Sequence, residues 1–414
     1  MVRRKSENII ALVKGIIYKK TELSKTSTSI LIFFIYALAV LGMCIILPRE
    51  HIWTALFYSG VILGAVLFAA LAENAKTSFS FNIFYSISFL ILFFILGFRN
   101  FSGIDDASYT KIFNDVSQHG WIAEFKATTM ESGYLLLNAI VSLFTKNYLY
   151  MQLLTSFIPL ILFYHAFKKY RSMISLPMAV FLLCTMLYFQ MLSVSLVRIF
   201  IAISIVVIAY YYIPKKNVKK YISLIVIASM FHYSALFMLV LLYFVIDKDN
   251  FSKKSKRFIV LAIIGIPVIF LAIVKLFVPF MGGRYTGYGI IGNLNFEISS
   301  FDTIPLIVLL IFYYKKIELK NTDYFKLFLS IFSLSCIIAF YSSMIPLGRL
   351  TFYANSAFFL AAPMVSKALN RDYRRIIFYG IIILYGLLYV YSTQFTLECD
   401  IPHLFPYKNI FFAI

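Results

Sequence analysis

Charged side chains and cysteines are scarce in this sequence of 414 residues. Only 14% of the chain is Asp, Glu, Lys or Arg, whereas 61% is hydrophobic. A soluble domain has about 25% charged residues, so this composition excludes both a soluble globular protein and a disordered one. The four cysteines lie far apart, without the spacing of metal ligands or of a disulfide framework; they are Cys44, Cys184, Cys336 and Cys399.

Phosphate-cradling glycine motifs and internal repeats are also missing. Without a Walker motif, the chain does not resemble an ATP-driven pump. Without a repeat, nothing indicates a transporter built from two inverted halves. We therefore expect no cofactor and no bound metal.

Basic residues are the exception to this scarcity of charge. Lys and Arg number 38 against 18 Asp and Glu, which gives a net charge of +20. They form short clusters between long apolar runs, not one stripe with interleaved aromatics. This is the pattern that the positive-inside rule predicts for cytoplasmic loops, so we expect no nucleic acid partner.

The apolar runs predict an all-α polytopic membrane protein with about 11 transmembrane helices, since each crossing needs ~20 residues. Residues 1–28 form a basic cytoplasmic N-terminus with no cleaved signal peptide. Residues 29–393 form one membrane domain, and 394–414 form a tail on the outer side. The expected spans are 29–47, 53–72, 79–98, 149–167, 174–193, 195–213, 258–279, 301–314, 323–342, 350–366 and 376–393.

Two apolar stretches do not fit a simple crossing. Residues 133–145 are too few to cross, so we expect an interfacial or partly inserted helix on the outer face. Residues 221–246 have basic clusters on both flanks, which places both flanks in the cytoplasm. This segment must enter and return with a turn near 231–234, as a re-entrant helical hairpin or as two short spans. The outer loops are 99–132 and 280–300.

Several arginines lie on the side that the positive-inside rule disfavours. Arg99, Arg198 and Arg349 lie at outer ends of spans, and Arg284 lies in the second outer loop. One such arginine could snorkel to lipid headgroups, but a group of them indicates function. The planar guanidinium matches phosphate oxygens in a bidentate manner, which predicts a phosphate or pyrophosphate ligand. Arg198 requires an anionic partner or water, because it stays charged.

Groups that could accept a proton lie on the same side. Asp105 and Asp106 are followed closely by Tyr109. The sequence leaves several roles open for the two carboxylates: they are solvated, they bind substrate, one of them acts as a base, or they bind a metal. Two adjacent side chains alone do not make an octahedral metal site. Glu131 binds substrate or stabilises the first turn of the short outer helix. His232 lies at the predicted turn. It is a core residue, or it orients a hydroxyl, donates a hydrogen bond to phosphate or acts as a base. The sequence leaves open whether Asp105, Asp106, Glu131 or His232 is the base.

Five short motifs follow one another along the chain, and the first four contain all of these residues except Arg284 and Arg349. They are Arg99 with Gly103-Ile104-Asp105-Asp106-Ala107-Ser108-Tyr109, then Glu131-Ser132-Gly133-Tyr134, Arg198-Ile199-Phe200-Ile201-Ala202, Phe231-His232-Tyr233-Ser234-Ala235-Leu236 and Phe405-Pro406-Tyr407-Lys408. In this order and spacing, the chain resembles the EpsG/Wzy group of O-antigen and exopolysaccharide polymerases.

The resemblance implies a membrane glycosyltransferase that needs no nucleotide sugar. It would transfer a growing glycan from undecaprenyl pyrophosphate to the non-reducing end of a lipid-linked repeat unit, at the outer face of the bacterial inner membrane. The expected partners are this lipid-linked oligosaccharide, membrane lipids, a flippase and a chain-length regulator. A flippase or transporter of lipid-linked oligosaccharide, an O-antigen ligase and a purely structural membrane protein are the alternatives.

If the chain is such a polymerase, we expect the following division of roles among the predicted site residues. The catalytic set is Asp105, Arg198, His232 and Arg349. Arg198 and Arg349 would bind the pyrophosphate, and Asp105 or His232 would be the base. The residues expected to bind substrate are Arg99, Asp106, Tyr109, Glu131 and Arg284.

Overall fold

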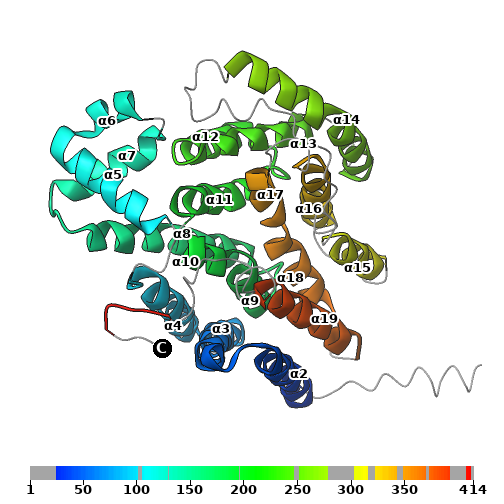
Figure 1. Cartoon of the computed structure of the whole chain (residues 1–414). Helices are drawn as coiled ribbons and strands as arrows, with labels where there is room; N and C mark the ends of the chain where they lie inside the picture. Colours follow the sequence, from blue (N-terminus) through cyan, green and yellow to red (C-terminus); the bar gives the residue numbers. More distant parts are fainter. Residues whose placement is uncertain are drawn as a thin grey trace, which may run out of the picture.

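The computed structural model of the chain is helical in the part that it describes (Figure 1). No strand longer than a single bridge is found in the part that it describes. It describes residues 25–100, 105–128, 130–194, 196–246, 251–277, 303–315, 322–342, 348–369, 373–391 and 407–411.

The first half of the chain, up to residue 212, contains the helices that carry most of the predicted site. Their bounds are α2 Lys25–Ile46, η1 Arg49–His51, α3 Ile52–Glu73, α4 Ser78–Gly97, α5 Asp106–His119, α6 Trp121–Ala127, α7 Ser132–Ser142, α8 Tyr148–Tyr170, α9 Leu176–Leu183, the π-helical segment η2 Cys184–Tyr188, α10 Phe189–Val194, α11 Val197–Ala209 and η3 Tyr210–Tyr212.

The second half contains the remaining helices. Their bounds are α12 Val218–Ser229, η4 Tyr233–Leu241, α13 Leu242–Ile246, α14 Phe251–Phe277, α15 Ile304–Tyr314, α16 Thr322–Ser342, α17 Gly348–Asn355, α18 Phe358–Ala368 and α19 Tyr373–Val390.

Six helices in the described ranges are long and apolar enough to cross a membrane. They contain residues 28–46, 52–73, 78–97, 148–170, 322–342 and 373–390. Five shorter apolar helices accompany them: 132–142, 176–188, 197–212, 233–245 and 304–314. The protein is therefore all-helical and membrane-embedded. The predicted span 350–366 is divided between α17 and α18.

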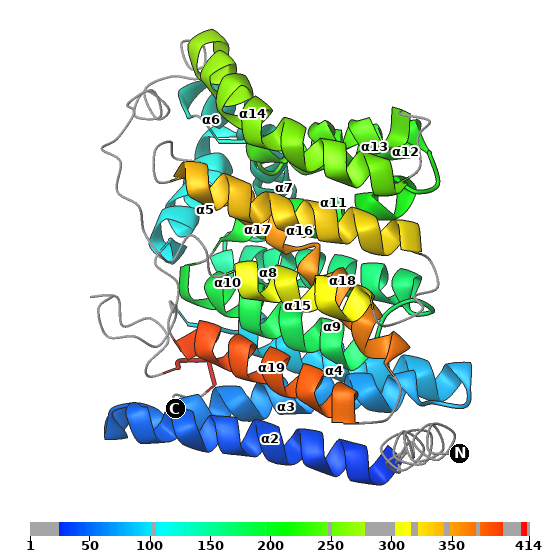
Figure 2. The same ribbon diagram turned by 90° about the vertical axis from the view of Figure 1, so that its right-hand side faces the viewer.

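The apolar helices lie side by side in one bundle, with their axes nearly parallel (Figure 2). Helix α3 packs along α4, α2 packs along α19, and α16 packs against α14 and α17. Helix α11 lies between α8 and α12, and every one of its residues is buried. A helix that is apolar on all sides belongs in the interior of a bundle, so α11 is the central helix.

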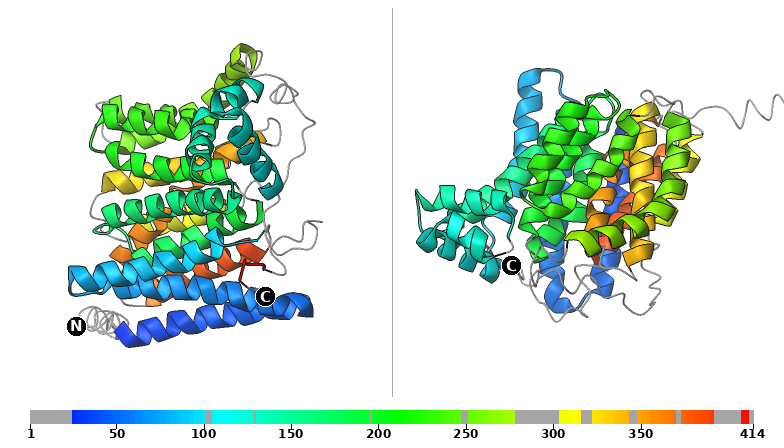
Figure 3. Two further views of the ribbon diagram at one scale, coloured as in Figure 1. Left: turned by 90° about the vertical axis from the view of Figure 1, so that its left-hand side faces the viewer. Right: turned by 90° about the horizontal axis from the view of Figure 1, so that it is seen from above.

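The two ends of the bundle differ in chemistry. At one end, α5, α6 and α7 form a small lobe beside the bundle (Figure 3); we call this the lobe end. Helix α4 finishes there, and α8 and α11 begin there. At the other end, the last turn of α8 carries Lys168 and Lys169, and α12 begins shortly after Lys215 and Lys216. We call this the basic end.

The chain reverses at the lobe end within residues 221–246, as the flanking charges predict. Helix α12 ends at Ser229, and η4 begins at Tyr233. The Tyr221 hydroxyl donates to the carbonyl of Met238, so the two halves lie against each other. Each helical half is shorter than the ~20 residues of a full crossing.

Residues 407–411 also lie at the lobe end, against the end of α4. The amide of Asn100 donates to the carbonyl of Lys408 at 2.9 Å, and the amide of Ile410 donates to the carbonyl of Phe98 at 3.0 Å. The buried Tyr407 donates its hydroxyl to the carbonyl of Ile95 at 2.8 Å. This C-terminal segment therefore fixes the chain where α4 ends, beside Arg99.

Candidate functional site

A buried ion pair joins the end of α4 to the start of α5. Arg99 Nη2 lies 3.0 Å from Asp106 Oδ1, and the two side chains are 0% and 2% exposed. Arg99 Nη1 also donates to the carbonyl of Leu96 at 2.8 Å and to Ser156 Oγ at 3.3 Å. The pair can be buried because the two charges compensate each other and the guanidinium makes further hydrogen bonds. It fixes the lobe to the bundle.

A glutamine on α8 supports the same junction. Gln152 Nε2 donates to the carbonyls of Gly97 and Arg99, at 2.8 and 2.7 Å. The last carbonyls of a helix have no partner within the helix, and a buried one is costly if it stays unbonded. Gln152 therefore stabilises the position of the backbone that carries Arg99.

A second ion pair lies at the lobe end of the central helix. Arg198 is in the first turn of α11, and its Nη1 pairs with Glu131 Oε2. The two side chains are 9% and 1% exposed. Arg198 Nε donates to the Tyr109 hydroxyl at 3.4 Å, with the guanidinium 6.0 Å from the centre of the ring. Arg198 Nη2 makes no hydrogen bond with the described residues.

Tyr109 is a neutral donor beside this ion pair. Burial raises the pKa of Tyr109 above its ordinary value, although the charge of Arg198 acts in the opposite direction. The phenol is therefore protonated at neutral pH. Because its oxygen accepts from Arg198, its own proton is available to a bound anion.

A histidine, a serine and a tyrosine form a hydrogen-bonded chain on the other side of Glu131. His232 Nδ1 lies 2.5 Å from Ser234 Oγ, and Ser234 Oγ donates to the Tyr353 hydroxyl at 3.2 Å. Since the serine proton points to Tyr353, Nδ1 is the donor to Ser234. This tautomer leaves Nε2 as the basic nitrogen of His232.

The two groups adjoin at the start of α7. The amide of Gly133 donates to the carbonyl of Met230 at 2.9 Å, which holds α7 against the turn that carries His232. The hydrogen bond from Ser234 to Tyr353 holds α17 against the same turn. Four segments therefore meet at one place. They are α7, α11, α17 and the turn that follows α12.

Nine site residues were predicted from the sequence, and six of them lie in this arrangement. Arg349 is exposed in the first turn of α17, and Asp105 is half-buried at the start of α5, where its charge acts on Tyr109. We call the six the lobe-end cluster: Asp105, Tyr109, Glu131, Arg198, His232 and Arg349. Arg99 and Asp106 form the buried pair at the base of the lobe, and Arg284 lies outside the described residues.

Comparison with known protein families decides what kind of protein this is. A model of the EpsG family matches residues 82–409. The chain belongs to the EpsG family. The match contains the whole lobe-end cluster and reaches the C-terminal segment at Asn409. No curated protein and no solved structure matches the chain. Membership of the EpsG family indicates a function of the polysaccharide-polymerase type.

The sequence alone did not identify three residues that support the site of this EpsG-family protein. Ser234 and Tyr353 complete the hydrogen-bonded chain from His232, and Gln152 supports the backbone of Arg99. Tyr353 follows Arg349 by four residues, a spacing that places both on one face of a helix. That spacing was the available signal. Gln152 had only the weaker signal of an amide within an apolar span.

No metal site accompanies the cluster. Among the residues that the structure describes, no group of three or more His, Cys, Asp or Glu side chains is placed to hold a metal ion.

Replacing Gly133 by alanine tests whether α7 must touch the turn. A Cβ at Gly133 would lie 2.8 Å from both Cβ and the carbonyl oxygen of Met230, closer than van der Waals contact allows. We expect Gly133→Ala to lower stability by about 1–3 kcal/mol, as overpacking does, and to lower activity with it. Thermal unfolding in detergent measures the first effect. Gly60→Ala, where no atom lies within 4 Å, is the control; equal behaviour of the two variants would contradict the prediction.

Proposed function

We propose that this EpsG-family protein is a Wzy-type polysaccharide polymerase. It transfers a growing glycan from undecaprenyl pyrophosphate to the non-reducing end of a lipid-linked repeat unit. One observation carries the proposal: Arg198 is held by Glu131 and Tyr109 at the lobe end of the central helix, and the start of α7, which follows Glu131, contacts the turn that carries His232.

The arginines supply the positive charge that a diphosphate leaving group requires. Arg198 Nη2 has no partner among the described residues, while Nη1 and Nε are fixed by Glu131 and Tyr109. Arg349 is exposed and makes no ion pair within the described ranges. Donors that are oriented before the reaction stabilise developing charge without reorganisation. Arg99 assists by fixing the start of α5, which carries Tyr109.

The proton of the attacking hydroxyl needs a base. The hydroxyl oxygen of the acceptor sugar bonds to the anomeric carbon of the donor, and the bond from that carbon to the pyrophosphate oxygen breaks. The pyrophosphate leaves with the electron pair, and the base takes the proton. We assign this role to His232 Nε2 or Asp105. Asp106 and Glu131 each compensate the charge of an arginine.

The charge distribution supports an orientation for the reaction. With the basic end in the cytoplasm, in keeping with the positive-inside rule, the lobe-end cluster faces the outer side of the bacterial inner membrane. Lipid-linked repeat units then reach it through a flippase, and a chain-length regulator acts on the growing product.

A reconstituted reaction tests the proposal. Purified protein in vesicles, given the lipid-linked repeat unit and no nucleotide sugar, should produce a ladder of longer glycans and release undecaprenyl pyrophosphate. Movement of the substrate across the bilayer without new glycosidic bonds would instead show a flippase. Transfer that requires a lipid core acceptor would show a ligase, and either result would overturn the proposal.

A further inference from the structure

Three lysines converge on two tyrosines at the basic end of the bundle. Lys169 Nζ donates to the Tyr212 hydroxyl at 2.8 Å and lies 4.3 Å from the ring centres of both Tyr211 and Tyr212. Lys215 Nζ donates to the Tyr211 hydroxyl at 2.7 Å, and Lys220 Nζ lies 5.4 Å from the centre of the Tyr212 ring. We call these five residues the lysine cluster. They come from the end of α8, from η3 and the turn after it, and from the start of α12.

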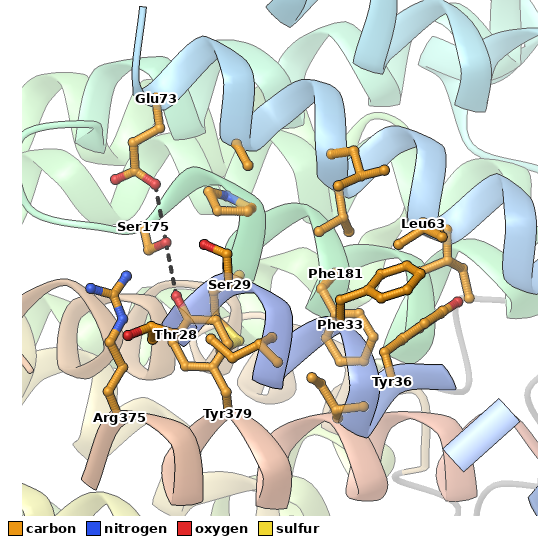
Figure 4. Close-up of a pocket in the computed structure, with 18 of the residues that line it drawn as sticks. Thr28, Ser29, Phe33, Tyr36, Leu63, Glu73, Ser175, Phe181, Arg375 and Tyr379 are labelled. Atoms are coloured by element: carbon orange, nitrogen blue, oxygen red, sulfur yellow. Dashed lines mark hydrogen bonds between the residues drawn. The ribbon is translucent and has the colours of Figure 1, made fainter. Parts of the chain in front are cut away.

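No carboxylate compensates the charge of the lysine cluster within the described ranges. None of its lysines makes an ion pair there, although Lys169 is half-buried. Asp323 makes none either, although the next residue, Tyr324, donates its hydroxyl to the carbonyl of Tyr211. Elsewhere at the basic end a lysine does have such a partner: Lys367 Nζ pairs at 3.2 Å with Glu73, which lines the cavity shown in Figure 4.

The two phenol rings hold the lysines in place but do not neutralise them. A ring face attracts an ammonium group, yet it carries no net charge. The like charges of the three lysines therefore repel one another, and an anion placed among them would lower the free energy of the cluster. The hydroxyls of Tyr211 and Tyr212 each accept from a lysine, so their own protons can be donated to the same anion. Ammonium and phenol donors together suit a phosphate group.

The turn between η3 and α12 keeps a lysine in a strained conformation. Lys216 has a φ of 53°, in the left-handed region that favours glycine. The amide of Lys216 donates to the carbonyl of Ile213 and the amide of Asn217 to that of Tyr212, at 2.9 and 3.1 Å, which is the pattern in which helices commonly end with glycine. A lysine here costs stability but adds a positive charge next to Lys215.

An apolar surface begins on α12 directly after the lysines. Ile222, Val226 and Ile227 are 36%, 48% and 45% exposed. Lys219 and Lys220, one turn earlier, are exposed as well. Since residues three or four apart share one face of a helix, Lys219, Ile222 and Val226 form one stripe that is cationic at its start and apolar after it. A soluble anion would contact only the cationic part, whereas a phospholipid would contact both.

We propose that the lysine cluster binds the phosphate of one anionic glycerophospholipid, such as phosphatidylglycerol, in the leaflet at the basic end. One acyl chain lies along the exposed face of α12. Basic sites between membrane helices are known to hold anionic headgroups in this way. The bound headgroup connects the end of α8 to the start of α12, on either side of the central helix α11. The proposal depends on the lysine cluster alone and not on the polymerase activity.

Lipid retention tests the site directly. The full chain is purified from nanodiscs that contain equal amounts of phosphatidylglycerol and phosphatidylcholine, and bound lipid is measured by native mass spectrometry. Lys169→Gln and Lys220→Gln should each lower the retention of phosphatidylglycerol about tenfold, as expected for one hydrogen bond to a charged group. Lys76→Gln is the matched control, because Lys76 is an exposed lysine just before α4 at the same end of the bundle, and it should retain the lipid normally.

Thermal unfolding separates lipid binding from a purely structural role of Lys169. In nanodiscs of phosphatidylcholine alone, Lys169→Gln removes repulsion and should unfold at the same temperature as the natural protein or at a higher one. Phosphatidylglycerol should raise the unfolding temperature of the natural protein more than that of the variant. Retention of phosphatidylglycerol that neither Lys169→Gln nor Lys220→Gln affects would overturn the proposal. Displacement of phosphatidylglycerol by inorganic phosphate would also overturn it, since that result would show a site for free anions.

Discussion

Replacing Arg198 by alanine should lower the rate of glycan polymerisation by about 10²–10³-fold, the usual cost of removing one fixed donor from a developing anion. Cells that carry only this variant should accumulate single-repeat glycans in place of a ladder. Arg198→Lys should also be slow, by at least about tenfold. A lysine keeps the charge but cannot contact Glu131, Tyr109 and a diphosphate at once, because it lacks the planar fork.

Arg49→Ala is the matched control for Arg198→Ala. Arg49 is also an arginine at the lobe end, but it is exposed in η1 and makes no ion pair within the described ranges. The control should polymerise at the normal rate, and both variants should be compared at equal amounts in the membrane. A normal ladder with Arg198→Ala would remove Arg198 from the mechanism.

The sequence predicted the features of the fold that depend on local pattern. Apolar length and flanking charge predicted the helical membrane architecture and a reversal near residues 231–234. Both patterns follow from the free energy of placing each segment in lipid or in water. The structure places the reversal at Met230–His232. The number of crossings stays a prediction. The interruption of one expected span between α17 and α18 has no comparable local signal.

Pairings between distant residues were beyond a reading of the sequence. Arg198 was predicted to need an anionic partner, but Glu131 lies 67 residues earlier, on a different element. Which carboxylate meets which arginine depends on how the start of α7 packs against the turn after α12, and that packing depends on Gly133, which carries no charge. Arg99 and Asp106 were predicted to bind substrate, and that role stays a prediction; the sequence did not predict that they pair with each other in the interior.

The Arg198–Glu131 pair requires a test that separates folding from chemistry. In a buried pair, removal of one partner leaves an uncompensated charge, whereas removal of both restores a neutral interior. A loss of activity in a single variant therefore has two physical causes. A double variant distinguishes them, because only the functional cause persists when both charges are gone.

Glu131→Ala should lower the stability of the protein by about 3–5 kcal/mol, because it leaves the Arg198 guanidinium buried without its counterion. The double variant Arg198→Met/Glu131→Leu should regain stability to within about 1 kcal/mol of the natural protein and yet form no polymer. Thermal unfolding in detergent and the reconstituted reaction measure the two properties on the same preparation. If the double variant polymerises normally, the pair serves only the fold. If it unfolds as readily as Glu131→Ala, the charge at Arg198 is not what destabilises the single variant.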